Sequence, residues 1–136
     1  MIRVHPDAVT DLREIKQTDP AAAGQLVAFI QQLKADPSLK DKLLEHNFGA
    51  DRAHEISVSK WISIYARVER LPVWRLKAWS MERQGLKYRL LYLYYWPDKT
   101  FWILGIAPRE SIDYDDPSHP LRLRIVKRIR LDFADA

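Results

Sequence analysis

The feature that most constrains the fold is a stretch in which three β-forming runs follow one another closely. These runs are VWRLKAWS (73–80), YRLLYLYYW (88–96) and FWILGIA (101–107). The first connection, over 82–87, contains Gly85, and the second begins at Pro97, which suits the first central position of a turn. Strands joined by connections this short must be antiparallel neighbours. Residues 72–109 are therefore predicted to form a three-stranded antiparallel meander.

Two prolines mark the starts of two helices in the N-terminal part of the chain. Pro6 lacks a backbone N–H, which costs little at the first helical position. Asp19 is a good N-cap with Pro20 directly after it, and this second helix is predicted to run to about Ala35. The apolar residues at helical spacing are Val9, Leu12 and Ile15, then Leu26, Phe29, Ile30 and Leu33. The short break between the helices predicts an antiparallel hairpin.

The segment between this hairpin and the meander is less regular. Three leucines indicate a short helix over 39–44, and residues 46–51 have the composition of a loop. After Ser59, the spacing of apolar residues over 61–68 favours a helical turn or two, although Ile62 and Ile64 also suit a strand.

A last helix is predicted from Leu121 onward. Its apolar residues recur at four-residue steps as Leu121, Ile125, Ile129 and Phe133. The basic residues mostly off that stripe are Arg122, Arg124, Lys127, Arg128 and Arg130. The helix is therefore expected to be apolar toward the sheet and basic outward. The predicted fold class is α+β, with an N-terminal helical hairpin packed on a small antiparallel β-sheet and a C-terminal helix, all in one domain over 1–136.

Composition narrows the function further. The chain has no cysteines, so disulfides and cysteine-rich zinc sites are excluded, and its four histidines lack metal-site spacing. We expect no metal and no cofactor. No signal peptide and no membrane-spanning run is present, so a cytoplasmic protein without a membrane partner is expected.

Charge is distributed unevenly along the chain. Residues 1–59 hold 7 Lys/Arg and 9 Asp/Glu, whereas residues 60–136 hold 15 and 9. A basic C-terminal half suggests a polyanionic partner, and the alternative is a solvated charged surface.

Four basic residues of the meander are predicted to lie together. Arg75 and Lys77 are two residues apart on one strand and so share a face. Arg89 lies near the start of the second strand, and Arg109 just after the end of the third. Antiparallel order brings these ends together, so Lys77, Arg89 and Arg109 should gather at one end of the sheet. Such cations repel one another unless an anion joins them, and a phosphate group fits that need.

The alternative is that these are ordinary surface residues, paired with Glu82, Asp113 or Asp115. Each one alone fits that interpretation, but all four at these positions favour an anion site. Tyr114 follows in a segment too polar for simple burial and could stack on a base. His119, beside Pro120, is predicted to cap or precede the last helix, or alternatively to reach the site.

The order of these motifs resembles the RelE/ParE superfamily, the toxins of bacterial type II toxin–antitoxin pairs. The residues that carry the resemblance are WRLK, then YRLLY, then ILGIAPRESIDYD and a following HP. It covers the chain except roughly residues 36–71. It implies a RelE-like fold and, for RelE-like members, metal-independent cleavage of mRNA in the ribosomal A site. In that reaction the 2′-hydroxyl attacks the adjacent phosphate and leaves a cyclic phosphate and a 5′-hydroxyl.

The resemblance also assigns roles to the site residues. The basic pair of the first strand corresponds to Arg75 and Lys77, the middle-strand arginine to Arg89, the strand-end arginine to Arg109 and the tyrosine to Tyr114. The first member of the pair is often lysine in the family and is Arg75 here. Arginine stays protonated, so the role of general base falls on Lys77, whose pKa neighbouring cations would lower.

The other implied roles concern RNA and protein partners. The outer face of the last helix, with Arg122, Arg124, Lys127 and Arg128, would contact ribosomal RNA phosphates. The family implies a cognate antitoxin, a possible toxin–antitoxin hetero-oligomer, and mRNA and ribosome as targets. Two alternatives remain: a ParE-like toxin that poisons DNA gyrase, and a non-catalytic RNA-binding module.

Overall fold

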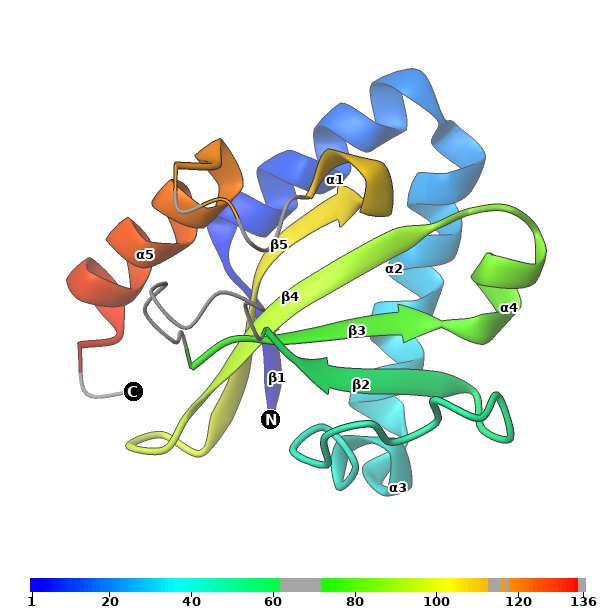
Figure 1. Cartoon of the computed structure of the whole chain (residues 1–136), viewed down its shortest axis with the longest axis horizontal. Coiled ribbons are helices and arrows are strands. Elements are labelled where there is room, and N and C mark those ends of the chain that lie inside the picture. The colour runs from blue at the N-terminus through cyan, green and yellow to red at the C-terminus, as the bar shows by residue number, and fades with distance from the viewer. Residues whose placement is uncertain (62–71, 113–115, 117, 135–136) are drawn as a thin grey trace.

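The computed structural model describes residues 1–61, 72–112, 116 and 118–134 (Figure 1). Five strands form one sheet in the order β1-β5-β4-β3-β2. Their bounds are β1 Ile2–Val4, β2 Ile56–Lys60, β3 Trp74–Ala78, β4 Tyr88–Tyr95 and β5 Thr100–Pro108. The helices are α1 Pro6–Thr18, α2 Pro20–Ala35, α3 Pro37–Lys40, α4 Trp79–Arg83 and α5 Pro120–Asp132, with a 3-10 turn η1 at Arg109–Ser111. The α+β class is confirmed.

The N-terminal hairpin matches its prediction closely. Both helices have proline at the first helical position, and the Asp19 side chain accepts a hydrogen bond from the backbone N–H of Ala22 at 3.1 Å. The same residue ends α1 with its own N–H bonded to the carbonyl of Ile15 at 2.7 Å. One aspartate therefore ends α1 and caps α2, which explains why the chain reverses within a single residue.

The predicted meander is also confirmed, since β4 pairs antiparallel with both β3 and β5. The prediction of a wholly antiparallel three-stranded sheet is wrong at the edges. β1 adds to β5 in parallel, with Ile2 opposite Phe101, and β2 adds antiparallel to β3. A parallel partner must come from a distant part of the chain, so no short turn in the sequence could have indicated it.

Opposite faces of the sheet pack against different helices because strand residues alternate in direction. Leu76, Leu90 and Tyr92 belong to the core that includes the apolar residues of α1 and α2. Leu91 and Leu93 belong to the second core, formed with α5. Figure 1 shows α2 crossing behind β3 and β4, with α5 away from it beside the sheet.

The first strand of the meander is shorter than predicted. It ends at Ala78, and Trp79 begins the short helix α4, so Trp79 does not continue the alternation of Arg75 and Lys77. The Trp79 indole is buried and its Nε1 donates to the carbonyl of Gly49 at 2.8 Å. This tertiary contact favours a turn over a further strand residue.

The strand β2 was not predicted from the sequence. The segment before it folds back along it, with the N–H of Val58 bonded to the carbonyl of Phe48 at 2.9 Å. Gly49 makes this approach possible, because it has a φ of 73° and an added Cβ would lie 1.8 Å from the carbonyl oxygen of Ile56. The helical turn predicted within 61–68 lies outside the described residues, apart from Trp61, which is buried.

Candidate functional site

Four basic residues line one hollow of about 280 Å³ on the sheet: Arg75, Lys77, Arg89 and Arg109. We call this hollow the strand site. Arg75 lies opposite Leu91, a residue of the α5 core, so the site is on the α5 side of the sheet. β3 supplies Arg75 and Lys77, β4 supplies Arg89, and Arg109 follows the end of β5. The structure therefore brings together Lys77, Arg89 and Arg109, predicted to gather at one end of the sheet, with Arg75, predicted to share the face of Lys77.

The edge strand β2 adds hydroxyl groups that the sequence did not indicate. Ser57 lies opposite Lys77 and Ser59 opposite Arg75, and both serines line the strand site. Ser59 Oγ accepts a hydrogen bond from Arg75 Nε at 2.6 Å. This bond ties the guanidinium of β3 to the edge strand β2. The sequence did not indicate these serines as site residues because it did not indicate a strand at β2.

Arg89 is the most buried of the four cations and has a carboxylate partner. Its Nη1 donates to Glu82 Oε1 and, at 3.0 Å, to the carbonyl of Tyr88. Only 7% of the Arg89 side chain and 12% of the Glu82 side chain are exposed. The pairing of a site cation with Glu82, weighed above as the alternative, is thus present at this position. Arg89 contributes less free charge than its neighbours, and its guanidinium is held rigidly.

Lys77 occupies the electrostatically unusual position in the strand site. Desolvation by burial lowers the pKa of its amine, and the nearby charges of Arg89, Arg109 and Arg75 lower it further. Glu82 opposes the shift. Its Nζ lies 4.3 Å from the centre of the Trp79 ring, which fixes its position. The prediction that neighbouring cations lower this pKa is correct in direction, but burial lowers it more than any one of them does.

The three remaining site predictions have different outcomes. Arg109 is exposed at the start of η1, and its backbone N–H is anchored to the carbonyl of Lys87 at 2.8 Å. Tyr114 lies outside the described residues, so its stacking role stays a prediction. His119 is the N-cap of α5, where its Nδ1 accepts from the N–H of Leu121 at 3.2 Å, as one of its two predicted roles required.

The prediction that α5 is basic outward is confirmed for Arg130, which is exposed, and is wrong for Arg122 and Arg124. Arg122 is only 5% exposed and lies 5.8 Å from the centre of the Trp61 ring. Arg124 forms two hydrogen bonds of 2.8 Å with the carboxylate of Asp11. These residues pack or pair within the protein, so an amphipathic pattern counted from apolar residues alone assigned them to the wrong side.

Arg128 also pairs with carboxylates of the protein, whereas Lys127 lies at the surface. Arg128 Nε donates to Asp7 at 3.1 Å, and its Nη1 lies 3.4 Å from Asp132 in the last turn of α5. Lys127 is exposed. Of the four α5 residues predicted to bind RNA, Lys127 is therefore the one whose charge points to the surface.

Two general findings apply to the part of the chain that the structure describes. Within it, no cluster of three or more His, Cys, Asp or Glu side chains could hold a metal ion. None of the described helices is long and apolar enough to cross a membrane.

No protein-family model, no curated protein and no solved structure matches this chain. The resemblance to the RelE/ParE superfamily rests on the order of the motifs in the sequence. Function must therefore be inferred from the chemistry of the strand site.

Proposed function

We propose that the protein is the RelE-like toxin of a type II toxin–antitoxin pair and acts in the cytoplasm as a metal-independent endoribonuclease on mRNA. The observation that carries this proposal is the position of Lys77, an amine with a lowered pKa held among Arg75, Arg89 and Arg109 in one hollow. A general base must be neutral to accept a proton, and the surrounding cations both favour neutral Lys77 and attract a phosphate.

The proposed reaction uses the strand site as follows. Neutral Lys77 takes the proton of a 2′-hydroxyl, and the oxygen attacks the adjacent phosphorus. The bond from phosphorus to the 5′-oxygen breaks, the leaving oxygen takes a proton from water, and a cyclic phosphate and a 5′-hydroxyl remain. Arg75 and Arg109 stabilise the negative charge that accumulates on the phosphate, a contribution worth about 3 kcal/mol for one well-placed donor.

Arg89 has an indirect role in this proposal. Because its guanidinium is buried and paired with Glu82, it is a positioning residue that acts through Lys77. The positive charge of Arg89 lowers the pKa of Lys77 and so favours the neutral amine. The negative charge of Glu82 raises that pKa and partly offsets the effect of Arg89. The RNA contacts of α5 reduce in this proposal to Lys127, with Arg122, Arg124 and Arg128 serving the fold.

The test is expression of the chain in bacteria with mapping of 5′-hydroxyl ends in mRNA. We expect growth arrest and new ends within translated messages. Lys77→Met should remove both, because it keeps an unbranched apolar chain close in size to that of lysine and loses the amine. Lys16→Met is a matched control, since Lys16 is exposed on α1 and outside the strand site. Growth arrest without new mRNA ends would contradict the ribonuclease and favour the gyrase-poisoning alternative.

One observation favours the non-catalytic RNA-binding alternative. Arg75 stands where the family often has lysine, and Glu82 neutralises Arg89, so the site has a single candidate base. Binding of RNA without cleavage would then survive in Lys77→Arg, which keeps the charge. Cleavage would not, because arginine stays protonated. Comparing RNA affinity and end formation in this one variant separates the two functions. In either case the proposed neutralising partner is a cognate antitoxin that covers the strand site.

A further inference from the structure

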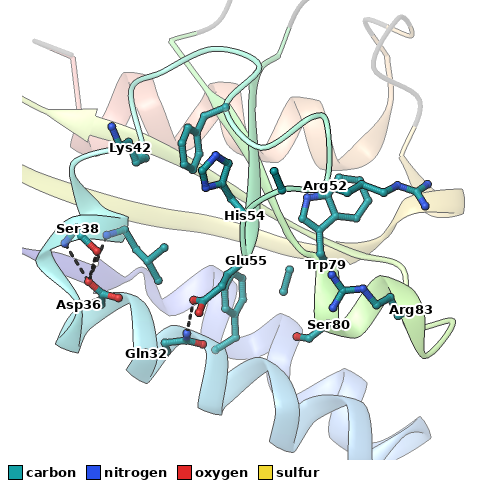
Figure 2. A pocket seen from close by; sticks show the side chains of 15 residues that line it. Gln32, Asp36, Ser38, Lys42, Arg52, His54, Glu55, Trp79, Ser80 and Arg83 are labelled. Carbon is teal, nitrogen blue, oxygen red and sulfur yellow. Dashed lines mark hydrogen bonds between the residues drawn. The ribbon is translucent and has the colours of Figure 1, made fainter.

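A groove of about 990 Å³ lies beside the strand site, and we call it the flanking groove (Figure 2). It is formed by α2, α3, the segment 48–55 and the start of α4. Figure 2 shows Arg52, Trp79 and Arg83 on one side of it, Asp36, Ser38 and Lys42 on the other, and His54 between them. This groove involves the segment that the family resemblance does not cover, and nothing in the proposed cleavage step uses it.

A smaller hollow of about 210 Å³ connects the flanking groove with the strand site. It shares Arg52, Trp79 and Arg83 with the groove, and Lys77 and Arg109 with the strand site. Five basic side chains line this connecting hollow: Arg52, Lys77, Arg83, Lys87 and Arg109. Its one acidic lining residue among those described is Glu82, whose carboxylate pairs with Arg89. The three hollows thus follow one another through shared lining residues, and we call this series, which carries excess positive charge, the basic path.

Trp79 fixes the geometry of this path at its centre. Its indole is buried and anchored to the carbonyl of Gly49. The guanidinium of Arg52 lies 5.0 Å from the centre of the ring and the amine of Lys77 lies 4.3 Å from it. One ring therefore holds a cation of the flanking groove and the proposed base of the strand site in a set relation.

The flanking groove also offers an aromatic surface. The exposed imidazole of His54 stacks on Phe48, with ring centres 4.5 Å apart and planes 30° apart. The two carboxylates that line the flanking groove have partners within the protein. Glu55 accepts from Gln32 at 2.7 Å, and Asp36 accepts from the backbone N–H of Ser38 at 3.0 Å. Proteins bind single-stranded nucleic acid with cations along its phosphate backbone and with aromatic side chains that stack on its bases.

We propose that the flanking groove and the connecting hollow bind the nucleotides of a single-stranded RNA next to the scissile phosphate, with phosphates on Arg52 and Arg83 and a base on His54. The identification of the scissile phosphate rests on the proposed ribonuclease function, whereas binding of the strand does not. A duplex is excluded by this assignment, because its paired bases are not free to stack on a side chain.

The experiment measures affinity for 2′-O-methyl oligonucleotides, which lack the attacking hydroxyl and cannot be cleaved. The probes are single strands of increasing length, from a dinucleotide upward. For the unchanged protein, affinity should rise with length as the strand reaches the flanking groove. Arg52→Gln with Arg83→Gln should lower affinity for the longer strands about tenfold or more and leave the dinucleotide unchanged. The salt dependence of log K should also fall by about 0.7 for each lost phosphate contact.

A matched control removes two exposed cations elsewhere, in Arg13→Gln with Lys16→Gln on α1. Equal losses in the two double variants would overturn the proposal, because they would show a response to net charge alone. So would an affinity independent of length, or equal affinity for a duplex.

His54 gives a second, independent readout. His54→Ala should weaken binding of the longer strands and His54→Tyr should restore it, since the aromatic face is what matters. Loss in both variants would overturn the stacking assignment. Because the probes are not cleaved, these results stand whether or not the chain proves to be a ribonuclease.

Discussion

The strand site and the helix α5 are both rich in basic residues, but they differ in how those residues pair with carboxylates. Arg124 and Arg128 of α5 each have an aspartate partner, Asp11 and Asp7 of α1. In the strand site, four cations line one hollow, and Glu82 pairs with the most buried of them, Arg89. The difference shows that the number of arginines on an element says little about ligand binding. What matters is whether the fold supplies the counter-charge, because unpaired cations held close together stabilise a bound anion.

The largest expected effect comes from removing Lys77, the proposed base of the strand site. Lys77→Met should lower the rate of RNA cleavage about 10²- to 10⁴-fold, the usual contribution of a general base. The unchanged protein should cleave faster as the pH rises toward the lowered pKa of Lys77, because the neutral amine is the active form. The measurement is single-turnover cleavage of an mRNA at several pH values. A Lys77→Met variant with the same pH dependence as the unchanged protein would show that another group titrates.

The next largest effect tests the paired arginines of α5. Asp11 accepts from the backbone N–H of Ile106 at 2.9 Å as well as from Arg124, and it lies near the edge of β5 beyond the last residue that β1 pairs. Asp11→Ala should lower the free energy of unfolding by about 3 kcal/mol or more, because it leaves a partly buried cation and an N–H without a partner. Urea unfolding measures this. Glu14→Ala, an exposed position on the same helix, is the control. A loss no larger than the control would mean that the pair contributes nothing.

A subtler effect concerns Glu82, the carboxylate that pairs with Arg89 of the strand site. Glu82 raises the pKa of Lys77 against the other charges, so Glu82→Gln should lower that pKa. The rising limb of the pH–rate profile should then move to lower pH, and the rate at neutral pH should increase. The measurement is the cleavage rate across pH for the two proteins, each confirmed as folded by circular dichroism. It shows in which direction the rising limb moves. A shift of the limb toward higher pH would contradict the role of Glu82.

The smallest effect is on stability, and it has the opposite sign from the effect on activity. The pKa of Lys77 is lower in the folded protein than its ordinary value of 10.5, so the protonated amine disfavours folding. Lys77→Met should therefore raise Tm at neutral pH by roughly 1–2 °C once solvent screening is allowed for. The gain should shrink as the pH rises through the lowered pKa and disappear above the ordinary value of 10.5, where the amine is neutral in both states. Calorimetry at two pH values tests this, and a lower Tm at neutral pH would show that the contact with Trp79 outweighs repulsion.

Local features of the sequence were enough to predict the helical hairpin, the meander and the gathering of Arg75, Lys77, Arg89 and Arg109. Caps, proline positions and short turns act over a few residues, and the alternation of a strand fixes which side chains share a face. These rules needed no knowledge of the rest of the chain.

The tertiary structure decided what depends on residues far apart. The parallel edge β1, the serines of β2 and the pairing of Arg89 with Glu82 all required the folded arrangement. The clearest case is Arg124, whose carboxylate partner lies 113 residues away in α1. The periodicity of a helix shows which residues share a side, but it carries no information on which charge of another element will face that side. The sequence thus determined where the cations are, and only the tertiary structure decided which of them lie against a carboxylate.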